Sequence, residues 1–189
     1  IAFANAWSAV GGGVTSVVPD TDFDLGAGGR GVLDGRNIVL WGGADTNILA
    51  GALALEQPIV QLQLEKDAVQ KASQNSRRIG GGFAVGGCTY TAEGTGLVSL
   101  GPVVRDNGTD GRLVVTLAGT TLGGFDKAVE LFTSRLFDTN SWQHRLPEFV
   151  VAGPNFLAAQ AGRVGGREDN LHGVVAAGYF DSGWGISTE

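Results

Sequence analysis

One stretch of the chain, residues 112–132, limits the possible folds more than any other: RLVVTLAGTTLGGFDKAVELF. Residues 113–117 are a run of β-branched and apolar side chains, the composition of a buried strand. Small residues follow, and apolar side chains then recur three and four positions apart over 125–132, with Lys127 on the polar side. The stretch predicts a strand, a glycine turn and a helix, which is the repeating unit of an open α/β sheet.

A second copy of this unit is expected near the start of the regular part of the chain. Residues 38–41 predict a buried strand and residues 42–43 a tight turn. A helix is expected from Asn47, with Asp45 or Thr46 as its N-cap, because short polar side chains satisfy the unpaired amides of a first helical turn.

Three further segments predict strands. Residues 58–64 are a possible strand, residues 147–152 predict a strand that ends at the turn 153–155, and residues 173–180 predict a last strand. A β-hairpin is expected over residues 79–100, since apolar residues alternate there with glycines.

Together these segments predict an α/β fold: a mainly parallel sheet with flanking helices and an inserted β-hairpin, in a single domain. The hairpin turn is expected at residues 93–96. Residues 1–26 are expected to form an irregular N-terminal segment and residues 27–189 the α/β domain. A chain of 189 residues is long enough to bury a proper core as one domain.

Composition excludes several classes of function. The net charge of −6 argues against nucleic acid as a partner, because no cationic stripe is present to replace counterions on phosphates. No apolar run approaches the roughly 20 residues needed to cross a bilayer, so no membrane span is expected. The 32 glycines lie mostly at the ends of apolar runs, where they indicate tight turns.

A secreted, extracellular origin is expected for this chain. It begins at Ile1 and contains no methionine, which predicts a processed or excised piece of a longer protein. Asn107 begins the triplet Asn-Gly-Thr, an N-glycosylation acceptor in a polar stretch. Cys88 has no partner within the chain, so either a buried thiol or a bridge to a missing segment is expected, and the burial statistics of free cysteine favour the former.

The sequence contains no evident catalytic constellation. None of its serines lies in the GxSxG frame of hydrolases, and no zinc motif accompanies His144 or His172. Asp20, Asp22 and Asp24 alternate, but the glycine turn and bidentate acid of a calcium loop are missing. Neither a metal nor a cofactor is therefore expected.

Ligands of open α/β sheets bind outside the carboxyl ends of the strands. The candidate ligand-binding residues are therefore those of the three turns that follow the expected strands: Gly42, Gly43, Asp45, Gly119, Thr120 and Asn155. The Asp45 carboxylate would repel phosphate, so the first turn is expected to be a packing turn rather than an anion site.

Aromatic residues suggest a second kind of site. Trp41 ends an apolar strand and is expected in the core, whereas Trp184 and Tyr179 lie near the end of the chain. Aromatic faces suit sugar rings, so a carbohydrate-binding surface remains open there beside the alternative of buried aromatics that cap the sheet edge.

The order of several short motifs resembles the C-terminal region of large secreted proteins, chiefly fungal, whose central part is an α/β-hydrolase of the prolyl-oligopeptidase or esterase type. The resemblance covers about residues 27–186. It rests on GVLDG at 31–35, NIVLWGGADTN at 37–47, IGGGF at 79–83, GLVSLGP at 96–102, the stretch 112–132, PEFVVAGP at 147–154 and GVVAAGYFDSGW at 173–184. In such proteins the nucleophile lies upstream, so the resemblance implies an accessory lobe and carries over no catalytic residue.

Three functions are weighed on this basis. The leading hypothesis is a non-catalytic accessory domain of a secreted hydrolase-like protein, whose partner is the upstream hydrolase domain or another chain of the same parent. The alternative is a self-standing extracellular module that binds carbohydrate or serves as an assembly subunit. The weakest is an enzyme that uses Asp45, Asp181 and His172, because no nucleophile accompanies them.

Overall fold

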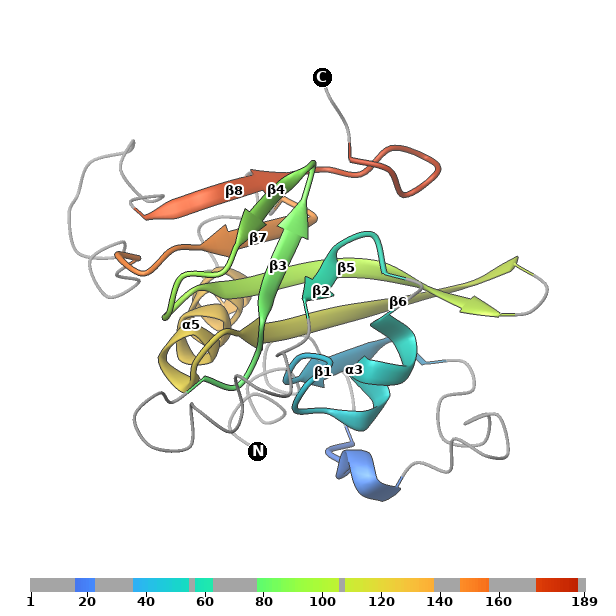
Figure 1. The fold of residues 1–189 in the computed structure, drawn as a ribbon. Helices are drawn as coiled ribbons and strands as arrows, with labels where there is room; N and C mark the ends of the chain where they lie inside the picture. The colour runs from blue at the N-terminus through green and yellow to red at the C-terminus, as the bar shows by residue number, and fades with distance from the viewer. Residues whose placement is uncertain are drawn as a thin grey trace.

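The structure, a computed structural model, describes residues 16–22, 36–54, 57–62, 78–105, 108–137, 147–156 and 173–186 (Figure 1). The regular elements in chain order are η1 (Asp20–Asp22), β1 (Ile38–Trp41), α3 (Ile48–Leu53), β2 (Val60–Leu62), β3 (Gly82–Val85), β4 (Cys88–Tyr90), β5 (Gly96–Arg105), β6 (Gly108–Gly119), α5 (Leu122–Phe137), β7 (Phe149–Ala152) and β8 (Val174–Gly178).

Five strands form a mixed sheet in the order β1-β6-β5-β7-β8, which we call the large sheet. Only β1 and β6 pair in parallel, with Ile38 opposite Val114, whereas the other three pairs are antiparallel. The described residues contain just two α-helices, α3 and α5. The predicted mainly parallel α/β fold with flanking helices is therefore wrong, and the protein is mostly β.

The antiparallel direction has a simple cause in the chain between β5 and β6. Only two residues separate these strands, and a parallel pair would need a crossover of a dozen residues or more. The dipeptide Asn107-Gly108, at the end of this link, is one that hairpin turns favour. Asn107 was predicted only as a glycosylation acceptor, which lies outside the described residues, and the central hairpin was not predicted.

Strands β2, β3 and β4 form a second, antiparallel sheet, the small sheet, which lies in front of the large sheet in Figure 1. The hairpin between β3 and β4 turns at Gly86 and Gly87, both of which have positive φ angles that favour glycine. The predicted turn at 93–96 instead leads from β4 into β5.

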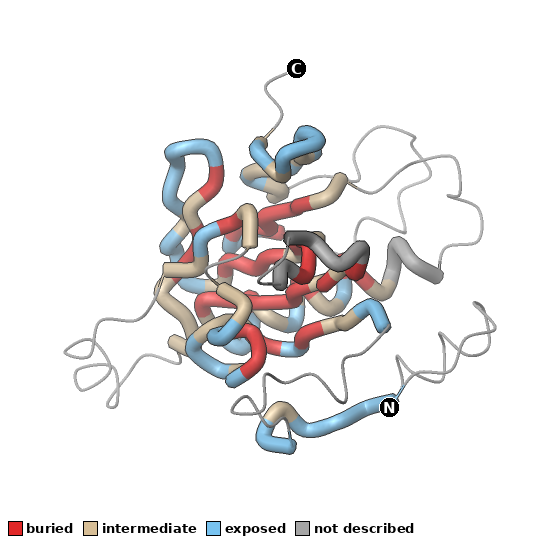
Figure 2. Tube along the Cα trace, turned by 90° about the vertical axis from the view of Figure 1, so that its right-hand side faces the viewer, coloured by how far each residue is buried: buried red, intermediate tan, exposed pale blue. Residues whose placement is uncertain are grey.

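The core lies on both faces of the large sheet, and Figure 2 shows buried residues concentrated along its strands. The cluster between the two sheets comprises Ile59, Phe83, Val85, Leu97, Ala118, Phe149 and Val151. Helix α3 packs on the same face nearer β1, through Leu49 and Ala50. Helix α5 covers the opposite face, where Leu131 clusters with Val150 of β7.

Glycines let the first turn of α5 approach the large sheet backbone to backbone. A Cβ added to Gly96 would lie 2.3 Å from the carbonyl oxygen of Gly124, and one added to Gly119 would lie 2.2 Å from the amide nitrogen of Phe125. A Cβ on Gly124 would lie 2.2 Å from the carbonyl oxygen of Thr95. The glycines around the central turn are therefore required for close packing.

None of the helices in the described segments is both long and apolar enough to cross a membrane. The structure does not describe residues 1–15 and 23–35. Of the N-terminal segment that was predicted to be irregular, it describes residues 16–22, which contain η1.

Candidate functional site

The three candidate turns lie at one edge of the large sheet. Strand β6 runs parallel to β1 and antiparallel to β5, and β7 is in turn antiparallel to β5. Strands β1, β6 and β7 therefore run in the same direction, and the turns after them share an edge. We call this edge, with Gly42, Gly43, Asp45, Gly119, Thr120 and Asn155, the turn edge.

Backbone amides of the turn after β1 are hydrogen-bonded to other groups of the protein. The amide of Gly42 donates to the Leu117 carbonyl at 2.9 Å, and the amide of Ala44 donates to Gln61 Oε1 at 2.7 Å. An anion bound at this turn would need the Ala44 amide, which the Gln61 side chain of β2 already occupies. The carboxamide of Gln61 was not singled out from the sequence, because only the fold brings β2 to this turn.

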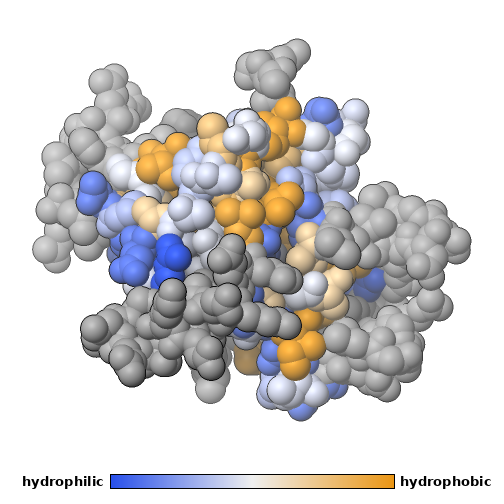
Figure 3. Space-filling view, in the orientation of Figure 1, coloured by the Kyte–Doolittle hydropathy of each residue, from blue (hydrophilic) through white to orange (hydrophobic). Residues whose placement is uncertain are grey.

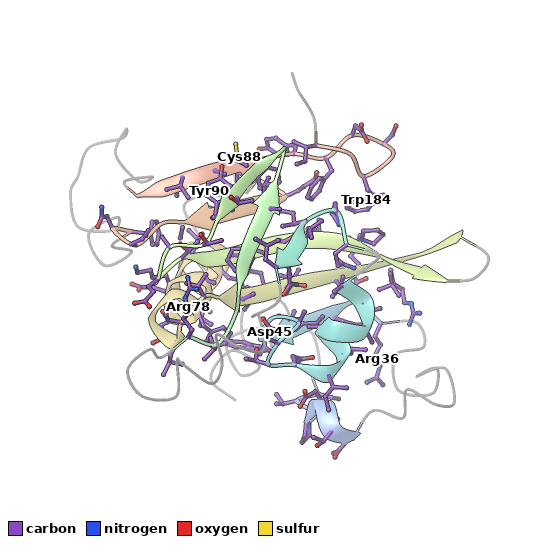
Figure 4. All side chains as sticks on the ribbon, viewed as in Figure 1. Arg36, Asp45, Arg78, Cys88, Tyr90 and Trp184 are labelled. Atoms are coloured by element: carbon purple, nitrogen blue, oxygen red, sulfur yellow. The ribbon has the colours of Figure 1, made fainter. Side chains whose placement is uncertain are left out.

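The helix that follows this turn is capped differently from the prediction. Asn47 is the N-cap of α3, and its side-chain oxygen accepts a hydrogen bond from the Ala50 amide at 2.9 Å. Asp20 of η1 adds a second contact, because its carboxylate accepts a bond from the Ile48 amide at 2.8 Å. Asp45 is instead exposed and accepts a bond from the Gly81 amide at 3.3 Å (Figure 4).

A small hollow separates the turns after β1 and β6. It is lined by Gly43, Ala44, Asp45, Gln61, Leu62, Ile79, Gly80, Gly81, Gly82, Phe83, Ala118 and Gly119. Its volume is about 10 Å³, which is roughly the space of a single water molecule. The structure thus brings Gly43, Asp45 and Gly119 together, but in a space that fits no substrate.

Thr120, another predicted ligand-binding residue, is fully buried. Its hydroxyl donates to the Ala92 carbonyl at 2.9 Å and accepts from the Thr95 amide at 3.2 Å. Its own carbonyl accepts a bond from the Ile79 amide at 2.9 Å. Thr120 therefore ties three segments of chain together and offers no polar atom to a ligand.

Lys127 of α5 binds the third turn. Its Nζ donates to the carbonyl oxygens of Gly94 at 3.0 Å, Gly153 at 3.4 Å and Pro154 at 2.6 Å, and the neighbouring Asn155 is exposed. The side chain is half-buried, although the helical pattern predicted it on the solvent side. No local signal reveals this contact, because the carbonyls come from loops far away in the sequence.

Removing these contacts should loosen the attachment of α5 to the turn edge. We expect Lys127→Met to lower the free energy of unfolding by about 1 kcal/mol, since the methylene stem is kept but hydrogen bonds from a charged, partly solvated group are lost. Glu130→Met, on the exposed side of α5, should change it by less than about 0.5 kcal/mol. Urea unfolding of both variants tests this, and equal losses would contradict it.

The Lys127 effect should also depend on pH. Burial lowers the pKa of Lys127 below its ordinary value of 10.5. Between the two values the unfolded chain binds more protons than the folded chain, so rising pH favours the folded state. The pKa of Tyr90, raised by burial and by Cys88, acts in the opposite direction but is common to both proteins. The advantage of wild type over Lys127→Met should therefore grow as the pH rises towards 10.5, and a constant difference would contradict this.

The enzyme hypothesis joins residues that the fold separates. Strand β8 runs antiparallel to β7, so Asp181, which follows β8, lies at the edge opposite to the turn edge and Asp45. The Asp181 carboxylate holds its own loop, where Oδ1 accepts from the amides of Gly183 and Gly185 at 2.8 Å each. His172, His144 and Trp142 lie outside the described residues.

One aromatic residue, Trp41, is placed differently from the prediction, whereas the positions of Tyr179 and Trp184 had been left open. Trp41 is 41% exposed rather than buried, because it ends an edge strand, and its ring centroid lies 6.3 Å from that of Phe125. Trp184 is half-buried, and its ring lies 5.9 Å from that of Phe180, which packs against the core between the sheets (Figure 4). Tyr179 is 47% exposed.

Cys88 is exposed, so the expectation of a buried thiol is wrong. It begins β4, an outer strand of the small sheet whose three residues are exposed or half-buried. Within the described part of the chain, no group of three or more histidine, cysteine or acidic residues is arranged to hold a metal ion.

Comparison with known proteins gives no relative: no family model, no curated protein and no solved structure matches this chain.

Proposed function

We propose that this chain is a non-catalytic accessory domain of a secreted hydrolase-like protein, which packs on or assists a catalytic domain encoded upstream. The observation that carries the proposal is the closure of the turn edge. There the Ala44 amide, the Thr120 hydroxyl and the Lys127 ammonium all bind groups of the protein itself. The order of motifs over about residues 27–186 supplies the second support, through its resemblance to the C-terminal region of such proteins.

The surface is compatible with packing against another domain. Val60 of β2 and Leu122 at the start of α5 are 55% and 58% exposed. Figure 3 shows apolar atoms at the surface on the side of the small sheet. Exposed apolar side chains on the side of the small sheet are compatible with contact to another protein surface.

The proposal is tested first by mapping peptides of the protein from its natural source. We expect the same polypeptide to contain, upstream, a hydrolase domain with a GxSxG motif. A source protein that lacks any hydrolase domain would overturn the proposal and favour the self-standing module, whether for carbohydrate or for assembly.

The second test measures hydrolysis of an activated ester by the purified chain alone. We expect a rate no higher than that of the heat-denatured sample, because the hollow between the turns after β1 and β6 holds about one water molecule. Hydrolysis that is lost in His172→Ala but kept in His144→Ala, the matched variant of the other histidine, would show catalysis by this chain and contradict the non-catalytic role.

A further inference from the structure

Three backbone carbonyl oxygens from two separate loops converge on one point of the turn edge. They belong to Gly94, which precedes β5, and to Gly153 and Pro154, which follow β7. Lys127 Nζ lies at that point, 3.0 Å from the first oxygen, 3.4 Å from the second and 2.6 Å from the third. We call these three oxygens the three-carbonyl site. Carbonyl oxygens grouped in this way can replace the hydration shell of a cation.

The pairing of β5 with β7 brings the two loops of the three-carbonyl site together. Gly96 of β5 lies opposite Ala152 of β7 in an antiparallel pair, and these are the last paired residues at this end. Gly94 and Pro154 each lie two residues beyond them. A Cβ added to Gly94 would lie 3.8 Å from Pro154 Cα, which shows how closely the two loops approach each other. The sheet therefore sets the spacing of the carbonyl oxygens.

Each loop is also held by hydrogen bonds that do not involve the lysine. The Gly153 amide donates to the Gly173 carbonyl at 2.7 Å, and the Gly153 carbonyl accepts a second bond from the Phe156 amide at 3.1 Å. The Thr120 hydroxyl holds the other loop through the Ala92 carbonyl at 2.9 Å. We therefore expect the three-carbonyl site to keep its shape when the lysine side chain is shortened.

The charges on the surrounding segments favour a cation at this point. Residues 91–95, 122–133 and 153–156 together contain three carboxylates and one cation, Lys127. A second cation, Arg78, binds the 91–95 loop at its first residue. Removing the lysine charge therefore leaves carboxylates in excess around three carbonyl oxygens, and unlike charges attract across such short distances.

We propose that the three-carbonyl site is a binding site for a small monovalent cation, which the chain fills with its own Lys127 ammonium and which a free ammonium ion fills when that side chain is shortened. The ammonium ion carries the charge and the N–H donors of the lysine head group, so it satisfies the same three oxygens. The proposal goes beyond the accessory role and does not depend on the upstream domain.

Binding of the free ion should be weak. The three ligands are neutral, and the site is partly open to solvent, since Lys127 is half-buried. We expect a dissociation constant of roughly 0.2 M, at which about 1 M ammonium shifts the unfolding equilibrium about sixfold towards the folded state.

Urea unfolding of Lys127→Ala in ammonium chloride and in tetramethylammonium chloride, each at about 1 M, measures this binding. The two salts screen charges equally, but the tetramethylammonium ion has no N–H to donate. Ammonium should favour the folded state of Lys127→Ala about sixfold more than that of wild type, whose site is already filled. Lys127→Met is the matched control. Its side chain keeps the stem and places a methyl group beside the oxygens, so it should respond like wild type.

Equal responses of Lys127→Ala and Lys127→Met would overturn the proposal. If Lys127→Ala does not fold, Gly123→Ala is added to every protein compared, because a Cβ at this exposed helical position meets no atom closer than 3.9 Å and improves helix propensity. A direct readout is the anomalous scattering of rubidium, a monovalent ion of similar size, in crystals of Lys127→Ala grown with rubidium chloride. We expect a peak at the three-carbonyl site, and crystals without one would contradict the assignment.

Discussion

Gly124→Ala is expected to lower the free energy of unfolding by about 3 kcal/mol or more, although alanine forms helices better than glycine. The new methyl carbon would lie 2.2 Å from the Thr95 carbonyl oxygen, a backbone atom that cannot turn aside. Overpacking of this kind usually costs about 1–3 kcal/mol, and the cost rises when backbone must move. Helix α5 would have to leave the large sheet at its first turn.

Gly123→Ala is the matched control because it makes the same change one residue earlier in the same helix. The nearest atom to its added Cβ lies 3.9 Å away, and the residue is exposed. Better helix propensity should then stabilise the protein by about 0.5–1 kcal/mol. Urea unfolding of both variants decides the matter: effects of the same sign would show that α5 does not lie this close to β5 and β6.

The pattern of apolar residues was informative about which segments form strands and helices. The run at 38–41 coincides with β1, and residues 125–132 lie within α5 (Leu122–Phe137). Local periodicity reports which face of a segment is buried, but not which strand lies beside it. The direction of the sheet depends on connections, and the two-residue link between β5 and β6 made the antiparallel arrangement unavoidable.

The candidate site also depends partly on local sequence and partly on residues far away in the chain. The position of the three turns after β1, β6 and β7 follows from local sequence, and the strand directions place them at one edge. The side chains that occupy the polar groups of that edge come from distant parts of the chain. Gln61 lies 17 residues from Ala44, and Lys127 lies 33 residues from Gly94. A glycine turn after a strand therefore indicates either a ligand site or close packing. Which of the two it is depends on the residues that the fold brings next to the turn.

Thr120→Val should be the second most damaging of the substitutions considered. Valine has nearly the same shape, so the packing of this fully buried side chain is kept while its hydroxyl is lost. The Ala92 carbonyl and the Thr95 amide would each lose the Thr120 hydroxyl as a partner, at 2.9 and 3.2 Å, and would keep their bond to one another at 3.2 Å. A hydrogen bond typically contributes about 0.5–1.5 kcal/mol to stability, and two are lost here, so we expect a loss of about 2 kcal/mol.

Two further variants separate the hydroxyl from the general effect of the substitution. Thr120→Ser keeps the oxygen and loses only a methyl group, so it should be clearly more stable than Thr120→Val. Thr89→Val, at an exposed position of β4, should change stability by less than about 0.5 kcal/mol. A Thr120→Val variant as stable as wild type would contradict this prediction. The hydroxyl would then not be needed to hold residues 92–95, and Thr120 would again be a candidate for ligand binding.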